Sequence, residues 1–171
     1  SWWESKQKRI ISVGRLKQEK NFPNLINAIK LLNEDYELSL KLLILGEGEK
    51  RKELESLIEN QNLSDDIFLP GEVINPIPYI SKADLFVLSS DYEGFGLVIV
   101  EALSVGKTIV STNCKSGPNE ILKGGKFGYL CKVNDSEDLA RTIKLALSAP
   151  LEPNLLIDRS EDFLIVNVAK Q

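Results

Sequence analysis

Short runs of apolar, often β-branched residues alternate along the chain with longer segments that carry apolar residues at helical spacing. This alternation constrains the fold most, because a strand, a helix and a second strand form the unit from which parallel sheets are built. The pattern predicts an α/β fold with a doubly wound, mostly parallel, Rossmann-like sheet of about six strands. The predicted strands cover residues 9–13, 38–45, 67–69, 84–88, 108–111 and 128–132, and the predicted helices cover 21–32, 49–60, 75–81, 96–104, 118–122 and 135–147.

The length of 171 residues fits one domain. The chain contains no methionine, and we expect residues 1–8 to be a linker from something upstream. Two prolines interrupt the pattern at residues 149–154, and apolar residues at helical spacing return near the end of the chain. We expect residues 160–171 to start a helix that packs on the domain or reaches another one.

The composition excludes several classes of protein. The net charge is −4 and the basic residues are spread along the chain, so we expect no nucleic-acid binding. The longest apolar runs are far too short to span a bilayer. Cys114 and Cys131 are the only cysteines and have no CxxC spacing, which indicates a reducing, cytoplasmic compartment. The chain has no histidine, which removes the commonest general base and metal ligand. No carboxylate cluster accompanies the phosphate-binding segments described below, so we expect no metal and no cofactor.

The loop that follows the first predicted strand carries two cations. Arg15 and Lys20 stand just before a helix start, for which Asn21 is the cap candidate. Two cations beside free backbone N–H groups suit an anion such as a diphosphate. The alternative, about equally supported by this loop alone, is a basic loop in contact with solvent.

The most informative segment is SSDYEGFGLVIVEAL, residues 89–103. Gly94 and Gly96 stand at a strand-to-helix turn, where glycine lets a phosphate approach the backbone. Glu93 and Glu101 are eight residues apart, which is about 12 Å on one continuous helix and too far for a glycosidase pair. The spacing suits two contacts at opposite ends of an elongated ligand. The alternatives are that Glu93 caps the helix and that Glu101 lies on a solvent-exposed face, although an apolar surround makes an exposed Glu101 the weaker reading.

Two other segments resemble nucleotide-binding motifs, but neither matches its motif completely. Residues 46–49 open like a GxGxxG fingerprint, but Arg51 stands where the third glycine belongs. Residues 106–108 end like a Walker A loop, but Glu101 stands where its first glycine belongs.

Taken in order, the motifs resemble the C-terminal, nucleotide-sugar-binding domain of glycosyltransferase family 4, a family of retaining enzymes with the two-domain GT-B architecture. The resemblance covers nearly the whole chain, and its hallmark is the EX7E element from Glu93 to Glu101. It implies that Glu93 is catalytic and lies by the transferred sugar, and that Glu101 holds the ribose hydroxyls. The implied diphosphate-binding residues are Arg15, Lys20, Gly94, Phe95, Gly96 and Leu97, and the implied base-binding residues are Gly71, Glu72, Val73 and Ile74.

The resemblance also implies a reaction and its partners. A sugar would move from a nucleotide-sugar donor to a hydroxyl of a glycan or lipid-linked acceptor in polysaccharide biosynthesis. The SGPNEIL segment favours a UDP-sugar as the donor. The acceptor would bind a first domain that these residues do not include, so we expect the chain alone to be inactive. Residues 160–171 would begin the helix that crosses back to that domain, and the parent enzyme would work in the cytoplasm, at the inner face of the cell membrane. The alternatives are a non-catalytic nucleotide-binding or regulatory module of the same fold and, more remotely, a receiver-type signalling domain.

Overall fold

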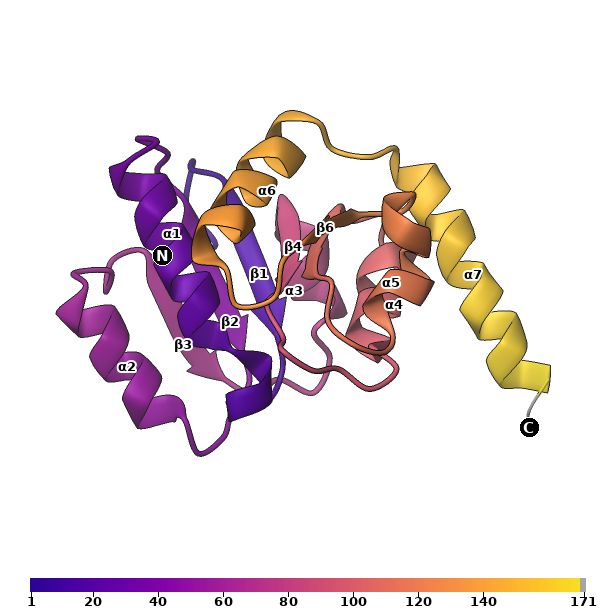
Figure 1. Cartoon of the computed structure of the whole chain (residues 1–171), viewed down its shortest axis with the longest axis horizontal. Helices are drawn as coiled ribbons and strands as arrows, with labels where there is room; N and C mark the ends of the chain where they lie inside the picture. The colour runs from indigo at the N-terminus through magenta and orange to yellow at the C-terminus, as the bar shows by residue number, and fades with distance from the viewer. Residues whose placement is uncertain (170–171) are drawn as a thin grey trace.

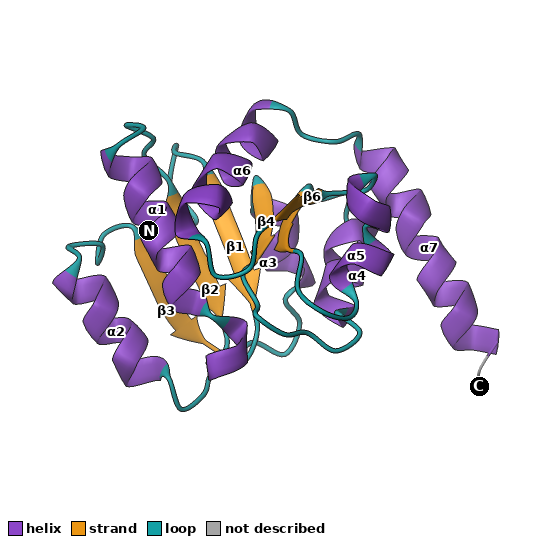
Figure 2. Cartoon of the chain, in the orientation of Figure 1, coloured by secondary structure: helices purple, strands orange, loops and turns teal. Residues whose placement is uncertain are grey.

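The computed structural model describes residues 1–169 and contains six strands and the helices that join them (Figures 1 and 2). The strands are β1 (Arg9–Val13), β2 (Lys41–Leu45), β3 (Ile67–Gly71), β4 (Leu85–Leu88), β5 (Ile109–Thr112) and β6 (Tyr129–Cys131). The α-helices are α1 (Phe22–Glu34), α2 (Arg51–Asn60), α3 (Ile77–Lys82), α4 (Leu97–Ser104), α5 (Pro118–Ile121), α6 (Ser136–Ser148) and α7 (Pro153–Ala169). Two short 3-10 helices are η1 (Gln18–Lys20) and η2 (Lys123–Gly125).

The six strands form one sheet in the order β3-β2-β1-β4-β5-β6, and every neighbouring pair is parallel. The predicted doubly wound α/β sheet is therefore confirmed. The strand order reverses direction between β1 and β4, and in such sheets ligands bind beyond the carboxyl ends of the strands at that switch point. A receiver-type domain has a different strand order, with the second strand at one edge next to the first, so that alternative is wrong.

Both faces of the sheet are covered by helices (Figure 2). On one face Ile10 and its neighbour Leu42 pack against α1, α2 and α6. On the other face Ile11 and its neighbour Leu43 pack against α3, α4, α5 and α7. Successive residues of a strand point to opposite faces, so strands buried on both sides must be apolar throughout. This is why the strand segments show as continuous apolar runs in the sequence.

The predicted second strand begins too early. The structure starts β2 at Lys41, and residues 38–40 lie outside it. The Asn33 side chain at the end of α1 accepts a hydrogen bond from the Leu40 N–H (2.8 Å) and donates to the Leu40 carbonyl (3.3 Å). These bonds use the backbone groups of Leu40 that a longer strand would need.

The last helix differs most from its prediction. It begins at Pro153, inside the segment that the prolines were expected to break, instead of at residue 160. Proline fits the first turn of a helix because its missing N–H would have no intrahelical partner there. Gly106, with a φ of +68°, lets the start of α7 pack closely against the end of α4. A Cβ on Gly106 would lie only 2.8 Å from the Cβ of Pro153. The helix packs along α4 and extends away from the domain (Figure 1). Residues 170 and 171 of the predicted helix lie outside the described residues.

The predicted linker over residues 1–8 is instead partly built into the domain. Trp2 is 2% exposed and packs within the apolar cluster on the α3 and α4 side of the sheet. Its indole N–H donates to the Ile10 carbonyl at 3.1 Å. A buried tryptophan with its N–H satisfied is a stable anchor, so this segment is fixed to the first strand.

Among residues 1–169, none of the helices combines the length and the hydrophobicity that a bilayer-spanning segment requires.

Candidate functional site

The loops after β1 and β4 meet at the switch point of the sheet. The strands pair directly through Ile10 and Ile11 with Leu85 and Phe86, so their carboxyl ends lie side by side. The β1–α1 loop contains Lys20, and the β4–α4 loop contains Glu93. The fold therefore brings together two of the predicted site residues.

Lys20 and Glu93 form a salt bridge across 73 positions of sequence. The Lys20 Nζ lies 2.7 Å from Glu93 Oε1 and 2.8 Å from Oε2, so the ammonium donates to both carboxylate oxygens. Glu93 is only 8% exposed, and an ionised carboxylate this buried requires such a partner. Sequence patterns predicted both residues for the site but not their contact.

The Glu93 carboxylate is held by a second donor that the sequence reading missed. The buried Ser90 hydroxyl donates to Glu93 Oε2 at 2.7 Å. The Thr112 hydroxyl, from the end of β5, donates to the Ser90 carbonyl at 2.5 Å. A polar serine just after an apolar strand was the signal available in the sequence. Glu93 is therefore fixed from two sides.

The segment between Glu93 and α4 leaves the backbone open at a helix N-terminus. Gly96, with a φ of +86°, is the N-cap residue and has no side chain with which to cap the helix. Gly94 has open space around the position of a Cβ, and Phe95 and Leu97 are exposed. The alternative in which Glu93 caps the helix is wrong, because no side chain caps α4. Free N–H groups at such an end attract anions.

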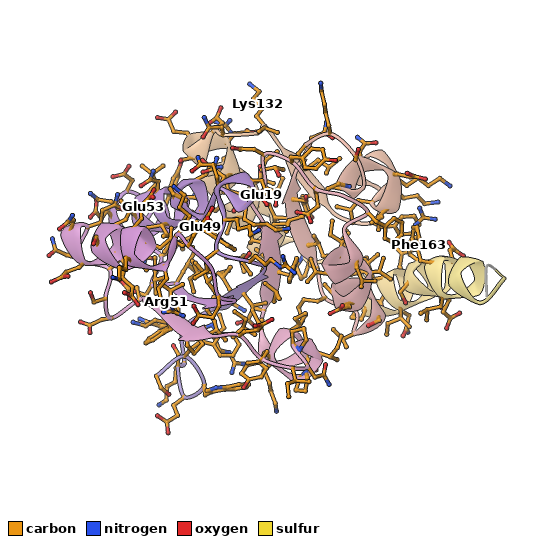
Figure 3. All side chains as sticks on the ribbon, turned by 90° about the horizontal axis from the view of Figure 1, so that it is seen from below. Glu19, Glu49, Arg51, Glu53, Lys132 and Phe163 are labelled. Carbon is orange, nitrogen blue, oxygen red and sulfur yellow. The ribbon has the colours of Figure 1, made fainter. Side chains whose placement is uncertain are left out.

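Behind this turn the backbone of the next loop approaches closely. A Cβ on Gly117 would lie 2.4 Å from the Phe95 carbonyl oxygen and 2.5 Å from that of Gly94. Only glycine fits at that distance. The Phe95 ring also packs against Phe163 of α7, with ring centroids 5.8 Å apart, and Figure 3 labels Phe163 on α7. The Gly117 backbone and the Phe163 ring therefore both contact this turn.

Glu101 is the fifth residue of α4, whereas Glu93 precedes the helix. The assumption of one continuous helix between the two carboxylates is therefore wrong, and the 12 Å figure does not apply. Glu101 is half-buried, and burial raises the pKa of its carboxyl. A carboxylate that is partly removed from water, with no salt bridge to any described residue, is suited to accept hydrogen bonds from a ligand.

Beside the switch point, the carboxyl ends of β1, β2 and β3 border an open hollow of about 380 Å³. Arg15, Glu72 and Val73, all predicted site residues, line it. Gly71 ends β3 with a φ of +112°, and its carbonyl accepts from the Gly46 N–H at 2.9 Å. The fourth predicted base-binding residue, Ile74, is fully exposed and is not part of the lining.

Two further residues at this hollow were missed. Glu47 is part of its lining, and both oxygens of its carboxylate accept from the Arg51 guanidinium, at 2.9 Å and 2.5 Å. This pairing lowers the pKa of Glu47. Arg51, labelled in Figure 3, also donates to the Leu69 carbonyl at 3.1 Å. The sequence showed Arg51 only as the residue that spoils a GxGxxG match.

Gly46, which lines the hollow, allows two of its loops to pack closely together. A Cβ at this position would lie 1.8 Å from the Gly14 carbonyl oxygen, so the loops after β1 and β2 touch backbone to backbone. Among the described residues, no group of three or more histidine, cysteine or acidic side chains is arranged to hold a metal ion.

The arrangement suits an elongated anionic ligand. Arg15 and Lys20 supply positive charge, and the open end of α4 supplies backbone donors, all at the carboxyl edge of the sheet. The hollow next to Arg15 has room for a flat polar group. A nucleoside diphosphate has these two parts.

Comparison with known proteins identifies the family of the chain. The family model described as "Glycosyl transferases group 1" matches residues 2–162. The N-acetylgalactosamine-N,N'-diacetylbacillosaminyl-diphospho-undecaprenol 4-alpha-N-acetylgalactosaminyltransferase of Campylobacter jejuni is 39% identical over 142 residues, which are 83% of this chain and 38% of that protein.

Two solved structures share the fold. The pneumococcal O-GlcNAc transferase GtfA, in complex with UDP and GlcNAc, is 25% identical with a TM-score of 0.80, over 93% of this chain and 34% of that one. A Staphylococcus aureus TarM variant in complex with fondaparinux, alpha-GlcNAc-glycerol and UDP is 26% identical with a TM-score of 0.78, over 91% of this chain and 31% of that one. The chain thus spans less than half the length of these relatives. Because the family model matches nearly all of the chain, the protein belongs to the glycosyl transferases group 1 family.

Proposed function

We propose that this chain is the donor-binding, C-terminal domain of a retaining glycosyltransferase of family 4. It would bind a UDP-sugar, and the parent enzyme would transfer the sugar to a hydroxyl of a glycan or lipid-linked acceptor. The relatives support the reaction class, because they are glycosyltransferases, and two related structures contain UDP. The name of the C. jejuni relative includes a diphospho-undecaprenol, which supports a lipid-linked acceptor and a parent enzyme at the inner face of the cell membrane.

The observation that carries the proposal is the Lys20–Glu93 salt bridge beside the open N-terminus of α4. The leaving diphosphate gains negative charge as the bond to the sugar breaks. Lys20, Arg15 and the helix N-terminus would stabilise that charge, and such fixed donors are a major source of rate enhancement. Glu93 would lie at the sugar, where its carboxylate faces the charge that develops near the anomeric carbon.

The remaining roles are those that the family resemblance implies. Gly94 to Leu97 would offer the backbone to the phosphates, and Glu101 would accept hydrogen bonds from the ribose hydroxyls. The base would enter the hollow beside Glu72 and Val73. No metal and no other cofactor takes part in this proposal.

The test is a thermal-shift and calorimetric comparison of UDP, GDP and ADP on the purified chain. UDP should raise the unfolding temperature most, and the shift should grow with ligand concentration, as linkage requires. A larger shift with GDP would contradict the choice of base, and no shift with any of the three would contradict the proposal as a whole.

Transfer activity separates this proposal from a non-catalytic module. The chain alone should not turn over, because positioning of two reactants can contribute about 7–11 kcal/mol and the acceptor would bind elsewhere in the parent. The full-length parent should transfer sugar with retention at the anomeric carbon. A parent that binds UDP-sugar without turnover, across a panel of glycan and lipid-linked acceptors, would favour the non-catalytic module.

A further inference from the structure

Asn21 has a backbone conformation that few residues adopt. It lies between η1 and α1 with φ 43° and ψ 50°, in the left-handed region. Its N–H donates to the Gln18 carbonyl at 3.1 Å and so closes η1. Its side-chain oxygen accepts from the Asn24 N–H at 3.3 Å and so caps α1. The residue thus ends one helix and begins the next, directly after Lys20.

The amide nitrogen of Asn21 joins this loop to two others. It donates to Asp91 Oδ1 at 2.8 Å, in the β4–α4 loop, and to Asn134 Oδ1 at 3.0 Å, in the β6–α6 loop. Just after the last of these loops, the hydroxyl of Ser136, the first residue of α6, donates to Asn24 Oδ1 at 2.7 Å. An amide group has two donor hydrogens and an acceptor oxygen, and in Asn21 all are used.

Two further hydrogen bonds connect these loops next to the Lys20–Glu93 salt bridge. The Asp91 N–H donates to the Glu19 carbonyl at 2.9 Å, and the Ser89 hydroxyl donates to the Lys20 carbonyl at 3.0 Å. Figure 3 labels Glu19 and Lys132, which precede Asn21 and Asn134 in two of the three loops. The Lys20 backbone is therefore attached to the same loop that contains its partner Glu93.

Asparagine meets all of these requirements, whereas glycine and aspartate do not. Glycine adopts the left-handed conformation readily but has no side chain. Aspartate tolerates that conformation and can cap a helix, but it has no donor and would repel Asp91. The amide was expected from sequence only to cap the helix, and the long-range bonds from its nitrogen add a second role.

We propose that Asn21 is a positioning residue, which joins the β1–α1, β4–α4 and β6–α6 loops so that the Lys20 ammonium is held at the diphosphate site. This inference rests on the proposed function and adds a residue that touches neither the base nor the phosphates. Without the amide the loops could separate, and Lys20 would lose its fixed place relative to the end of α4. The nucleoside part of the ligand, bound in the hollow beside β2 and β3, would not be affected.

The experiment measures UDP binding by calorimetry and uridine binding by NMR titration, for wild type and for Asn21→Gly. The variant keeps the left-handed backbone and removes only the amide. UDP affinity should fall about tenfold, the effect of one or two hydrogen bonds, while uridine affinity stays within about twofold. Asn62→Gly is the matched control, because Asn62 is also left-handed with a φ of 58° but is exposed in the turn after α2. It should leave both affinities unchanged.

A second pair of variants tests the same bond from the exposed partner, where folding is not at risk. Asp91→Ala removes the acceptor, and Asp91→Asn keeps an acceptor oxygen. UDP affinity should fall in the first and be restored in the second. Equal loss of UDP and uridine affinity in Asn21→Gly, or wild-type UDP affinity in both Asn21→Gly and Asp91→Ala, would overturn the positioning role. Failure of the wild-type chain to bind UDP would instead contradict the proposed function, and with it this inference.

Discussion

The Lys20 ammonium and the Glu93 carboxylate face each other end to end, with Nζ 2.7 Å and 2.8 Å from the two carboxylate oxygens. In this salt bridge each group neutralises the charge of the other. A diphosphate would compete with Glu93 for the ammonium, and the two anions would repel each other. A Glu93 that contacted only the transferred sugar would have little influence on UDP binding, whereas its salt bridge with Lys20 predicts a clear one.

Glu93→Gln should therefore tighten UDP binding, on the order of tenfold, because it frees Lys20 and removes a nearby negative charge. Lys20→Ala should weaken UDP binding by about 1.5–3 kcal/mol, the scale of a hydrogen bond to a charged group. Calorimetry at one ionic strength compares both with Lys17→Ala, a lysine in the same loop outside the salt bridge, which should behave as wild type. UDP binding weaker in Glu93→Gln than in wild type would show that the two groups do not compete.

Glu101→Gln should change stability and binding in opposite directions. Burial raises the pKa of Glu101 in the folded chain, so folding is favoured when the carboxyl is protonated. The free energy of unfolding then falls as the pH rises from the ordinary pKa of a glutamate through the raised pKa of the folded chain. It is therefore lower at pH 7 than at acidic pH. The glutamine variant should be more stable than wild type at pH 7 in urea unfolding, with the difference vanishing at low pH.

The same variant should bind UDP more weakly, because the ribose hydroxyls would lose a charged acceptor. Glu49→Gln, an exposed glutamate before α2, is the control and should leave both quantities unchanged. If Glu101→Gln bound UDP like wild type while gaining stability, the contact with the ribose would have to be abandoned.

Gly94→Ala should separate binding from folding. A Cβ at Gly94 meets nothing within 4 Å, and the residue does not have a positive φ. The unfolding free energy should therefore stay within about 0.5 kcal/mol of wild type, as for most surface substitutions. UDP affinity should nevertheless fall, because the methyl group would occupy the space where the phosphates approach the backbone. Unchanged UDP affinity would place the phosphates elsewhere.

Trp2→Ala tests whether the first eight residues belong to the folded domain. The buried indole should make this substitution cost about 3–5 kcal/mol in urea unfolding, as for other large buried aromatic side chains. The matched control is Trp3→Ala, because Trp3 is half-exposed and packs on Tyr79 with ring centroids 5.0 Å apart. This variant should lower the free energy of unfolding by about 1 kcal/mol. Similar costs for the two variants would mean that the segment is a linker after all.

Much of the fold could be predicted because its signals are local. Strands buried on both faces must be apolar throughout, and helices with the sheet on one side and solvent on the other must be amphipathic, so both leave a recognisable pattern in the sequence. The six strands and the order of the elements were predicted in this way. Boundaries were less certain where a distant contact decides them, as when Asn33 occupies the backbone of Leu40 and shortens β2.

In the candidate site, too, some features could be predicted from the sequence and others depend on contacts between distant residues. The sequence by itself determined which residue types are present, the glycines at the turn before α4, and the loops in which Arg15, Lys20 and Glu93 lie. Only the tertiary structure decided that Lys20 meets Glu93 and that Asn21 joins three loops. These contacts join residues from separate loops or depend on how side chains pack, and parallel strands that lie far apart in the sequence bring their carboxyl ends to one edge. The spacing of these residues along the chain does not reveal that they lie close together, because the order of the strands in the sheet creates their proximity.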